Sequence, residues 1–117
     1  MKIYEIRDIL NAVVLEGEHK LEVSISAGGG ADLMDDVMSS VAQDAVLLTG
    51  LISENVIQTA KVAGVSAIVF VRGKKPGDRI LKLARSYDLP ILVTDYSLFV
   101  SCGRLYINGL RGLEGSW

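Results

Sequence analysis

Polar and cationic residues follow three short apolar segments of the chain, at the points where those segments end. Arg72 and Lys74 come directly after one apolar run, and Thr94-Asp95-Tyr96 comes after the next. Cationic side chains of this kind can bind phosphate, and a tyrosine ring can stack on a base. The alternative is a solvated turn ahead of a helix, which two neighbouring lysines fit equally. The candidate ligand-binding residues at these segment ends are Thr49, Gly50, Arg72, Gly73, Lys74, Thr94, Asp95 and Tyr96.

A glycine run at Gly28, Gly29 and Gly30 is a second candidate for ligand contact. It follows the alternating segment 22–26, which predicts a strand, and we expect it to turn tightly into a helix over about 31–41. Bare backbone N–H groups ahead of a helix can hold a phosphate. The run does not match the G-x-G-x-x-G motif, because Leu33 stands where the third glycine belongs. Acidic residues at the start of the expected helix would repel phosphate, which favours a purely structural turn.

The sequence contains no recognisable catalytic constellation. Asp95 has no histidine partner and Ser97 has no base near it, so neither a triad nor a dyad is visible. The single His19 and the single Cys102 cannot form a His/Cys metal site within one chain. The acidic residues from position 32 onward leave open a bound Mg²⁺ or an enzyme for phosphorylated or carboxylate substrates. The expectation is a protein that is not an enzyme, without cofactor or metal.

Composition excludes several classes of function. A net charge of −2 and the lack of any long run of Lys or Arg argue against nucleic acid as a partner. No apolar run reaches the roughly 20 residues that span a bilayer, so no membrane partner is expected. With one cysteine the chain has no disulfide framework, and we expect a cytoplasmic protein. Half of the residues are hydrophobic, which predicts a sheet covered on both faces and a homo-oligomer or a partner enzyme.

The elements that must position the candidate residues alternate between strands and helices. Strands are expected over 12–16, 22–26, 45–49, 67–71 and 91–93, with helices over 3–11, 31–41, 96–107, between Ser53 and Gly64, and between Asp78 and Pro90. This order predicts one α/β domain over 1–117, with a mainly parallel sheet and right-handed crossovers. Ligands of such sheets bind outside the carboxyl ends of the strands. The tail 109–117, rich in glycine, is expected to fray unless Trp117 docks on a partner.

With these segments laid out, the chain resembles the DRTGG domain family and the N-terminal domain of bacterial HPr kinase/phosphorylase. The resemblance rests on segments 32–38, 65–73, 89–97 and 103–106. It implies an α/β domain of the kind also found at the N-terminus of Mur ligases. Such domains occur beside CBS or phosphotransacetylase domains, self-associate, and have no established catalysis of their own. The kinase activity of the HPr enzyme belongs to a separate P-loop domain. The segment Gly73-Lys74-Lys75 does not match the P-loop motif, so no kinase activity is expected.

Taken together, these features predict a non-catalytic regulatory or ligand-sensing domain of DRTGG type. The expected ligand is a nucleotide or another phosphorylated metabolite. The alternative is an accessory interaction subunit that docks on a metabolic enzyme and binds no small molecule.

Overall fold

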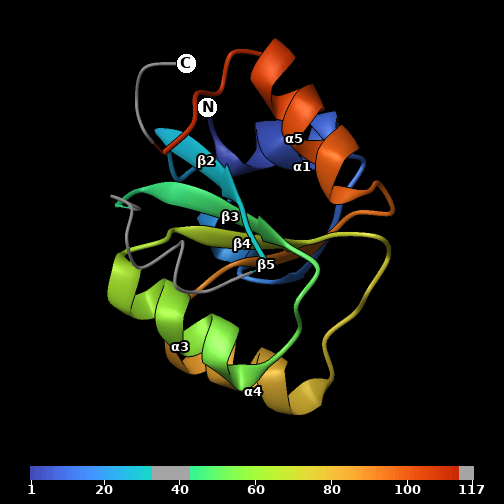
Figure 1. Ribbon diagram of the computed structural model, residues 1–117. Coiled ribbons are helices and arrows are strands. Elements are labelled where there is room, and N and C mark those ends of the chain that lie inside the picture. The colour runs from blue at the N-terminus through green and yellow to red at the C-terminus, as the bar shows by residue number, and fades with distance from the viewer. Residues whose placement is uncertain (33–42, 114–117) are drawn as a thin grey trace.

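The computed structural model describes residues 1–32 and 43–113 and shows three layers, with helices on both faces of a five-stranded sheet (Figure 1). The strands lie in the order β1-β5-β4-β3-β2. Their bounds are β1 Val13–Glu16, β2 Ala27–Gly30, β3 Ala45–Thr49, β4 Ala67–Phe70 and β5 Ile91–Val93. Strands β2 to β5 are parallel, and β1 pairs antiparallel with β5. The predicted α/β class with a mainly parallel sheet is confirmed.

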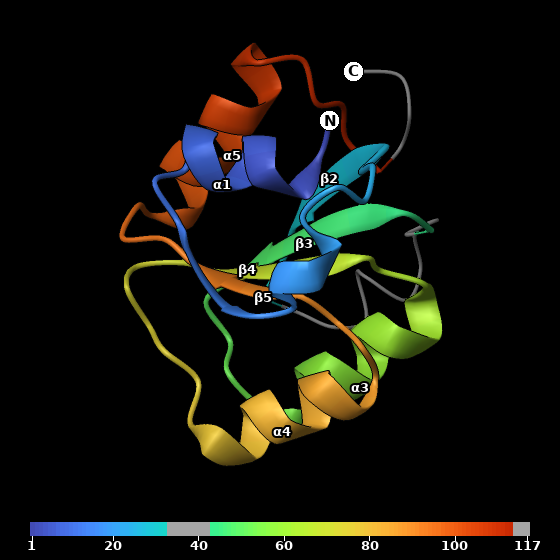
Figure 2. The same cartoon turned by 180° about the vertical axis from the view of Figure 1, so that it is seen from behind.

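Helices of the described residues cover both faces of the sheet. Their bounds are α1 Ile3–Ile9, the 3₁₀ helix η1 Glu18–Lys20, α3 Glu54–Ala63, α4 Asp78–Ser86 and α5 Leu98–Ile107. The opposite view in Figure 2 shows α1 and α5 on one face and α3 and α4 on the other. None of the helices in the described ranges is long and apolar enough to cross a membrane.

Local signals in the sequence set the ends of two of these helices. The hydroxyl of Ser53 accepts a hydrogen bond from a backbone N–H in the first turn of α3 at 3.3 Å, and Ser97 does the same for α5 at 3.2 Å. Gly64 ends α3 in the left-handed conformation, at φ +83°. The expected helices between Ser53 and Gly64 and over about 96–107 are therefore confirmed.

The central strands β3, β4 and β5 are buried on both faces, as continuous apolar runs in a parallel sheet predict. Alternate side chains of one strand belong to different cores. Ile68 and Phe70 pack on the side of α3 and α4, whereas Val69 packs on the side of α1 and α5. The sheet is thus packed on both faces, and its carboxyl ends carry the loops that follow β3, β4 and β5.

The glycine run forms strand β2 itself, so the prediction of a strand over 22–26 followed by a glycine turn is wrong. Gly28, Gly29 and Gly30 pair in parallel register with β3. A Cβ on Gly28 would lie 2.9 Å from a methyl of Leu110, and a Cβ on Gly29 would lie 2.5 Å from a methyl of Leu113. The glycines therefore allow side chains from the end of the chain to press directly on the strand. Local sequence does not reveal contacts between segments so far apart.

The segment 109–113 docks on the outer edge of β2, which corrects the expectation that the whole tail frays. The backbone N–H of Gly28 donates to the carbonyl of Arg111 at 2.8 Å, and Leu110 is buried. This contact covers part of the outer edge of β2, the last strand of the sheet among the described residues. Trp117 and most of the expected helix over 31–41 lie outside the described residues; Ala31 and Asp32, which are described, are not helical.

Ser101 on the inner side of α5 is fully buried, and its hydroxyl has no hydrogen-bond partner in the part of the chain that the structure describes. Burying an unpaired hydroxyl costs roughly 1–3 kcal/mol. We therefore expect Ser101→Ala to raise the free energy of unfolding by about 1 kcal/mol, as measured by urea denaturation. A loss of stability would instead reveal a hydrogen bond that this hydroxyl makes in solution.

Candidate functional site

The carboxyl ends of β3, β4 and β5 form one continuous rim, which brings together most of the residues that the sequence singles out. The backbone N–H of Arg72 donates to the carbonyl of Tyr96 at 2.8 Å, and that of Gly73 donates to Thr94 at 2.8 Å. Lys74 Nζ donates to the carbonyl of Gly50 at 3.4 Å. These bonds tie the three loops to one another. The rim therefore contains Thr49, Gly50, Arg72, Gly73, Lys74, Thr94, Asp95 and Tyr96, whereas Gly28 and Gly29 lie within β2, away from it.

A tight turn after β4 presents the cationic side chains of the rim. Arg72 and Gly73 both adopt the left-handed conformation, at φ 60° and φ 67°, and the N–H of Lys74 donates to the carbonyl of Val71 at 3.3 Å. Two consecutive positive φ values closed by this bond form a type I′ turn. Arginine in this conformation is strained by roughly 1–2 kcal/mol. Backbone strain of this kind gathers at functional sites, which makes this turn the centre of the candidate site.

Gly50 leaves room for the arginine. A Cβ at this position would collide with the guanidinium of Arg72, so the guanidinium lies directly over the Gly50 backbone. Arg72 and Lys74 are both exposed, and both reach the loop after β3. The turn thus places two positive charges side by side at the end of the sheet.

Asp32, which the sequence prediction left out of the ligand site, belongs to the same rim. Its Oδ1 accepts hydrogen bonds from the backbone N–H of Gly50 at 2.8 Å and from the hydroxyl of Thr49 at 3.1 Å. The hydrogen bond from Gly50 is the largest cause of a lowered Asp32 pKa, and burial of the carboxylate opposes this shift. The hydrogen bond from Thr49 and the positive charges of Arg72 and Lys74 lower the pKa further. Asp32 therefore holds the Gly50 loop in place and partly balances the cations. Its position directly after a glycine-rich segment was the only sequence signal for this role.

The lowered pKa of Asp32 makes part of the stability depend on pH. The folded pKa lies below the unfolded value of about 3.9, so the contribution is complete above that value and is lost as pH falls through the folded pKa. We expect Asp32→Asn to be less stable than the parent protein at pH 7, with the difference shrinking as pH falls below about 4. Urea denaturation at pH 7 and pH 3 measures both differences. A difference of equal size at the two values would show that the charge of Asp32 contributes nothing.

Tyr96 is a partly covered aromatic surface at the other end of the rim. The guanidinium of Arg104, on α5, lies 4.4 Å from the centre of the Tyr96 ring. The Tyr96 hydroxyl accepts a hydrogen bond from Asn11 Nδ2 at 2.9 Å. The ring is therefore fixed, and a base could stack only on surface that Arg104 leaves free. Asn11 reaches the rim from a distant segment, whereas Arg104 lies on the helix that directly follows the rim, and no local motif marks either of them.

Thr94 supports the rim from below. It is buried, its hydroxyl donates to the carbonyl of Leu10 at 2.6 Å, and the N–H of Tyr96 donates to the same hydroxyl at 3.3 Å. The residue thus joins the end of α1 to the loop after β5. Its role in the rim is to position Tyr96.

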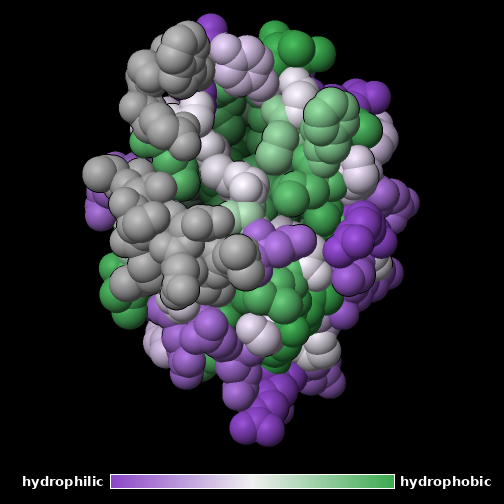
Figure 3. All heavy atoms as spheres, in the orientation of Figure 1, coloured by the Kyte–Doolittle hydropathy of each residue, from purple (hydrophilic) through white to green (hydrophobic). Residues whose placement is uncertain are grey.

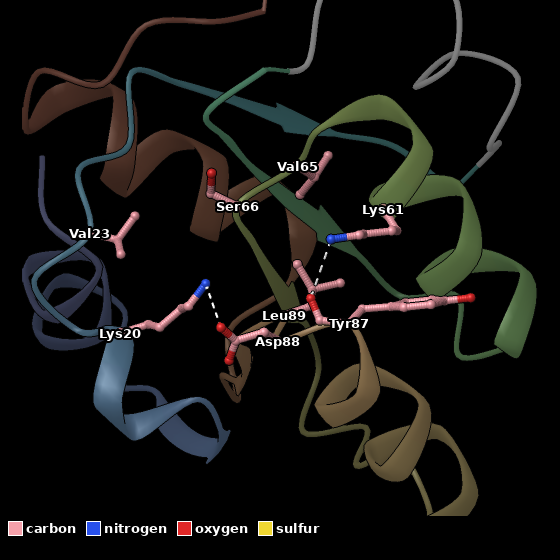
Figure 4. A pocket seen from close by; sticks show the side chains of 8 residues that line it. All are labelled: Lys20, Val23, Lys61, Val65, Ser66, Tyr87, Asp88 and Leu89. Atoms are coloured by element: carbon pink, nitrogen blue, oxygen red, sulfur yellow. Dashed lines mark hydrogen bonds and ion pairs between the residues drawn. The ribbon is translucent and has the colours of Figure 1, made fainter.

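A pocket of about 140 Å³ lies at the other end of the strands, near the amino ends of β4 and β5 (Figure 4). Lys20 Nζ and His19 Nε2 lie 2.9 Å and 2.7 Å from the carboxylate of Asp88, so one acid already partners both. Lys61 points across the pocket toward the backbone of Tyr87, whose carbonyl accepts its hydrogen bond at 3.5 Å. The polar groups of this pocket largely satisfy one another, so it is the weaker ligand site.

The described residues of the rim carry groups suited to binding a ligand. Among the described residues, no histidine forms a hydrogen bond with Asp95 or Ser97. His19 pairs instead with Asp88, at the opposite end of the strands. No group of three or more His, Cys, Asp or Glu side chains in residues 1–32 and 43–113 could hold a metal ion. The rim offers the cations of Arg72 and Lys74 and the aromatic ring of Tyr96.

Comparison with known proteins agrees with this description. A family model described as the DRTGG domain matches residues 5–105, so the chain belongs to the DRTGG domain family. A search of curated proteins found no match.

One similar solved structure contains the CBS and DRTGG domains of the regulatory region of Clostridium perfringens pyrophosphatase, complexed with its activator diadenosine tetraphosphate. The two folds agree with a TM-score of 0.75 at 17% sequence identity. The match covers 94% of this chain and 47% of that one, so the chain spans about half the length of that structure. At this level of identity the likeness concerns the fold alone.

Proposed function

We propose that the chain is a regulatory domain without catalysis of its own, which binds a nucleotide or another phosphorylated metabolite at the rim. The observation that carries the proposal is the turn after β4. It keeps Arg72 in a strained left-handed conformation, with its guanidinium over Gly50 and beside Lys74. A guanidinium can bind phosphate oxygens through two parallel hydrogen bonds, and an ammonium adds a second charge.

Two further features support a nucleotide as the ligand. Tyr96 and Arg104 offer flat surfaces at the same rim, which suit a base better than an inorganic ion. The structurally similar regulatory region of the pyrophosphatase is described in complex with a nucleotide activator. That region also contains CBS domains, so the description supports the class of ligand without assigning it to this fold.

Thermal unfolding of the purified chain with a panel of ligands tests the proposal. The panel contains diadenosine tetraphosphate, ATP, other nucleotides and sugar phosphates, each with and without Mg²⁺, and the matching nucleosides serve as controls without phosphate. A ligand at 100 times its dissociation constant stabilises the folded state by about 2.7 kcal/mol, which raises the midpoint by about 10 °C.

A selective rise with one phosphorylated compound, absent with its nucleoside, is the expected result. A flat panel would contradict the proposal and favour the alternative of an accessory subunit that docks on an enzyme. The exposed apolar residues Phe99 and Ile107 on α5 are the observation that keeps this alternative open.

A further inference from the structure

The carboxylate of Asp95 lies directly against the turn after β4. A Cβ built on Gly73 would lie 2.9 Å from Asp95 Oδ1, so the glycine lets the carboxylate approach the backbone of the turn. The residues on either side of Asp95 are bonded to the same turn. The carbonyl of Thr94 accepts from the N–H of Gly73, and that of Tyr96 accepts from the N–H of Arg72, both at 2.8 Å. The Asp95 carboxylate therefore lies at the rim between the cationic turn and Tyr96.

The described part of the rim contains two carboxylates, and they differ in their partners. Asp32 accepts hydrogen bonds from the loop after β3. Asp95 is exposed, and no residue in 1–32 or 43–113 forms a hydrogen bond or ion pair with its side chain. Figure 3 shows hydrophilic residues on the right of the view, the side on which β3 and β4 end in Figure 1. An ionised carboxylate accepts hydrogen bonds and donates none, so Asp95 presents acceptor oxygens to a ligand at the rim.

Positive and negative charges occupy different sides of the turn. The guanidinium of Arg72 lies over Gly50, and Lys74 Nζ donates to the carbonyl of Gly50, so both cations reach toward β3. The Asp95 carboxylate comes from the loop after β5, on the other side. A phosphate is attracted to the first side and repelled by the second. A phosphorylated ligand therefore places its phosphate toward β3 and an uncharged part against Asp95.

The parts of a nucleotide follow one another in the same order as these groups. Strands β3, β4 and β5 are neighbours in the sheet, and neighbouring strands lie about 4.8 Å apart. With the phosphate at Arg72 and Lys74 and the base on Tyr96, the sugar lies against Asp95. Ribose carries two hydroxyl groups, and an acidic side chain at the end of a parallel strand is suited to accept hydrogen bonds from them.

A divalent cation is the other partner that a carboxylate near a phosphate can take. Mg²⁺ is commonly held by one or two carboxylates together with phosphate oxygens. Beside Asp95, however, the positive charges of Arg72 and Lys74 on the neighbouring turn oppose a bound cation. Sugar hydroxyls carry no charge and meet no such opposition, so they are the partners that this arrangement favours.

We infer that Asp95 accepts hydrogen bonds from the ribose hydroxyls of a nucleotide bound at the rim. The site therefore selects ribonucleotides over nucleotides whose sugar lacks these hydroxyls. The inference rests on the proposed function, because Asp95 acts only on a ligand that the turn after β4 already holds.

Calorimetric titration of the full chain with the four common ribonucleoside triphosphates and their 2′,3′-dideoxy forms tests the inference. The ribonucleotide that binds best should bind about tenfold more tightly than its dideoxy form, because hydrogen bonds to a charged group are stronger than neutral ones. Asp95→Ala should bring this ratio close to one while binding the dideoxy form at least as well as the parent protein does. Glu18→Ala is the control, since it removes an exposed carboxylate from η1 and should keep the ratio.

The same titrations in EDTA separate sugar hydroxyls from a bound cation. The ratio should persist there, and a ratio that disappears without Mg²⁺ would assign Asp95 to the metal and overturn the inference. Equal binding of the two forms by the parent protein, or an unchanged ratio in Asp95→Ala, would overturn it while leaving the proposed function intact. If none of these nucleotides binds, the inference falls, and the thermal panel of phosphorylated compounds decides the proposed function by itself.

Discussion

Replacing Gly17 by alanine is expected to lower the free energy of unfolding by about 3 kcal/mol, the largest single effect that the structure predicts for a change of one methyl group. Gly17 has a φ of +88°, and a Cβ there would lie 2.7 Å from the Cα of Pro90 and 2.9 Å from its Cβ. The left-handed conformation costs alanine roughly 1–2 kcal/mol. The collision adds roughly 1–3 kcal/mol, because neither the backbone nor the proline ring can move aside easily.

The position of Gly17 explains why this cost affects the whole sheet. The residue follows β1 directly, and Pro90 precedes β5, whose Ile91 pairs with Glu16. Gly109→Ala is the matched control, because Gly109 also has a positive φ, +106°, but no atom lies within 4 Å of its Cβ position. Urea denaturation should show a clearly larger loss for Gly17→Ala than for Gly109→Ala. Equal losses would mean that contact with Pro90 is unimportant.

Replacing Arg72 by asparagine is expected to weaken binding of a phosphorylated ligand by 10- to 100-fold without destabilising the protein. A charge-assisted hydrogen bond is worth roughly 1.5–3 kcal/mol, which accounts for the loss of affinity. Asparagine tolerates the left-handed conformation that strains arginine, so the free energy of unfolding should stay the same or rise by up to about 1 kcal/mol. Such opposite effects on affinity and stability are typical of a residue retained for binding.

Calorimetric titration and urea denaturation of Arg72→Asn measure the two quantities. Arg79→Gln is the control, because the Arg79 side chain is 86% exposed and pairs with Glu54 on the neighbouring helix instead of with a rim residue. This control should bind like the parent protein. If both substitutions weaken binding equally, the effect comes from net charge. If Arg72→Asn leaves the affinity unchanged, the turn after β4 does not bind the phosphate.

The parts of the fold that sequence predicts well are those that local interactions determine. The apolar runs of β3, β4 and β5 and the capping serines Ser53 and Ser97 are correctly read because their signals lie within a few residues. The rim could be foreseen for a related reason. Once strands are known to be parallel, their carboxyl ends must meet at one edge.

Long-range packing accounts for what sequence analysis missed. The glycine run resembles a turn locally, yet it pairs with β3 as a strand, and Leu110 and Leu113 pack against it. From the sequence, Asp32 is expected in the first turn of a helix, yet its carboxylate accepts a hydrogen bond from the backbone N–H of Gly50. Asn11 reaches the Tyr96 hydroxyl only because the end of α1 lies beside the loop after β5. Each of these contacts joins segments whose proximity exists only in the folded chain.

Amide NMR of the isotopically labelled chain, titrated with the nucleotide that stabilises it most, tests the central claim most directly. The account predicts that the largest shifts fall on the rim, at Gly50, Gly73 and Tyr96. It also predicts that amides around the opposite pocket, such as Lys61 and Tyr87, change little. Shifts concentrated around that pocket would contradict the assignment of the ligand site to the carboxyl ends of the strands.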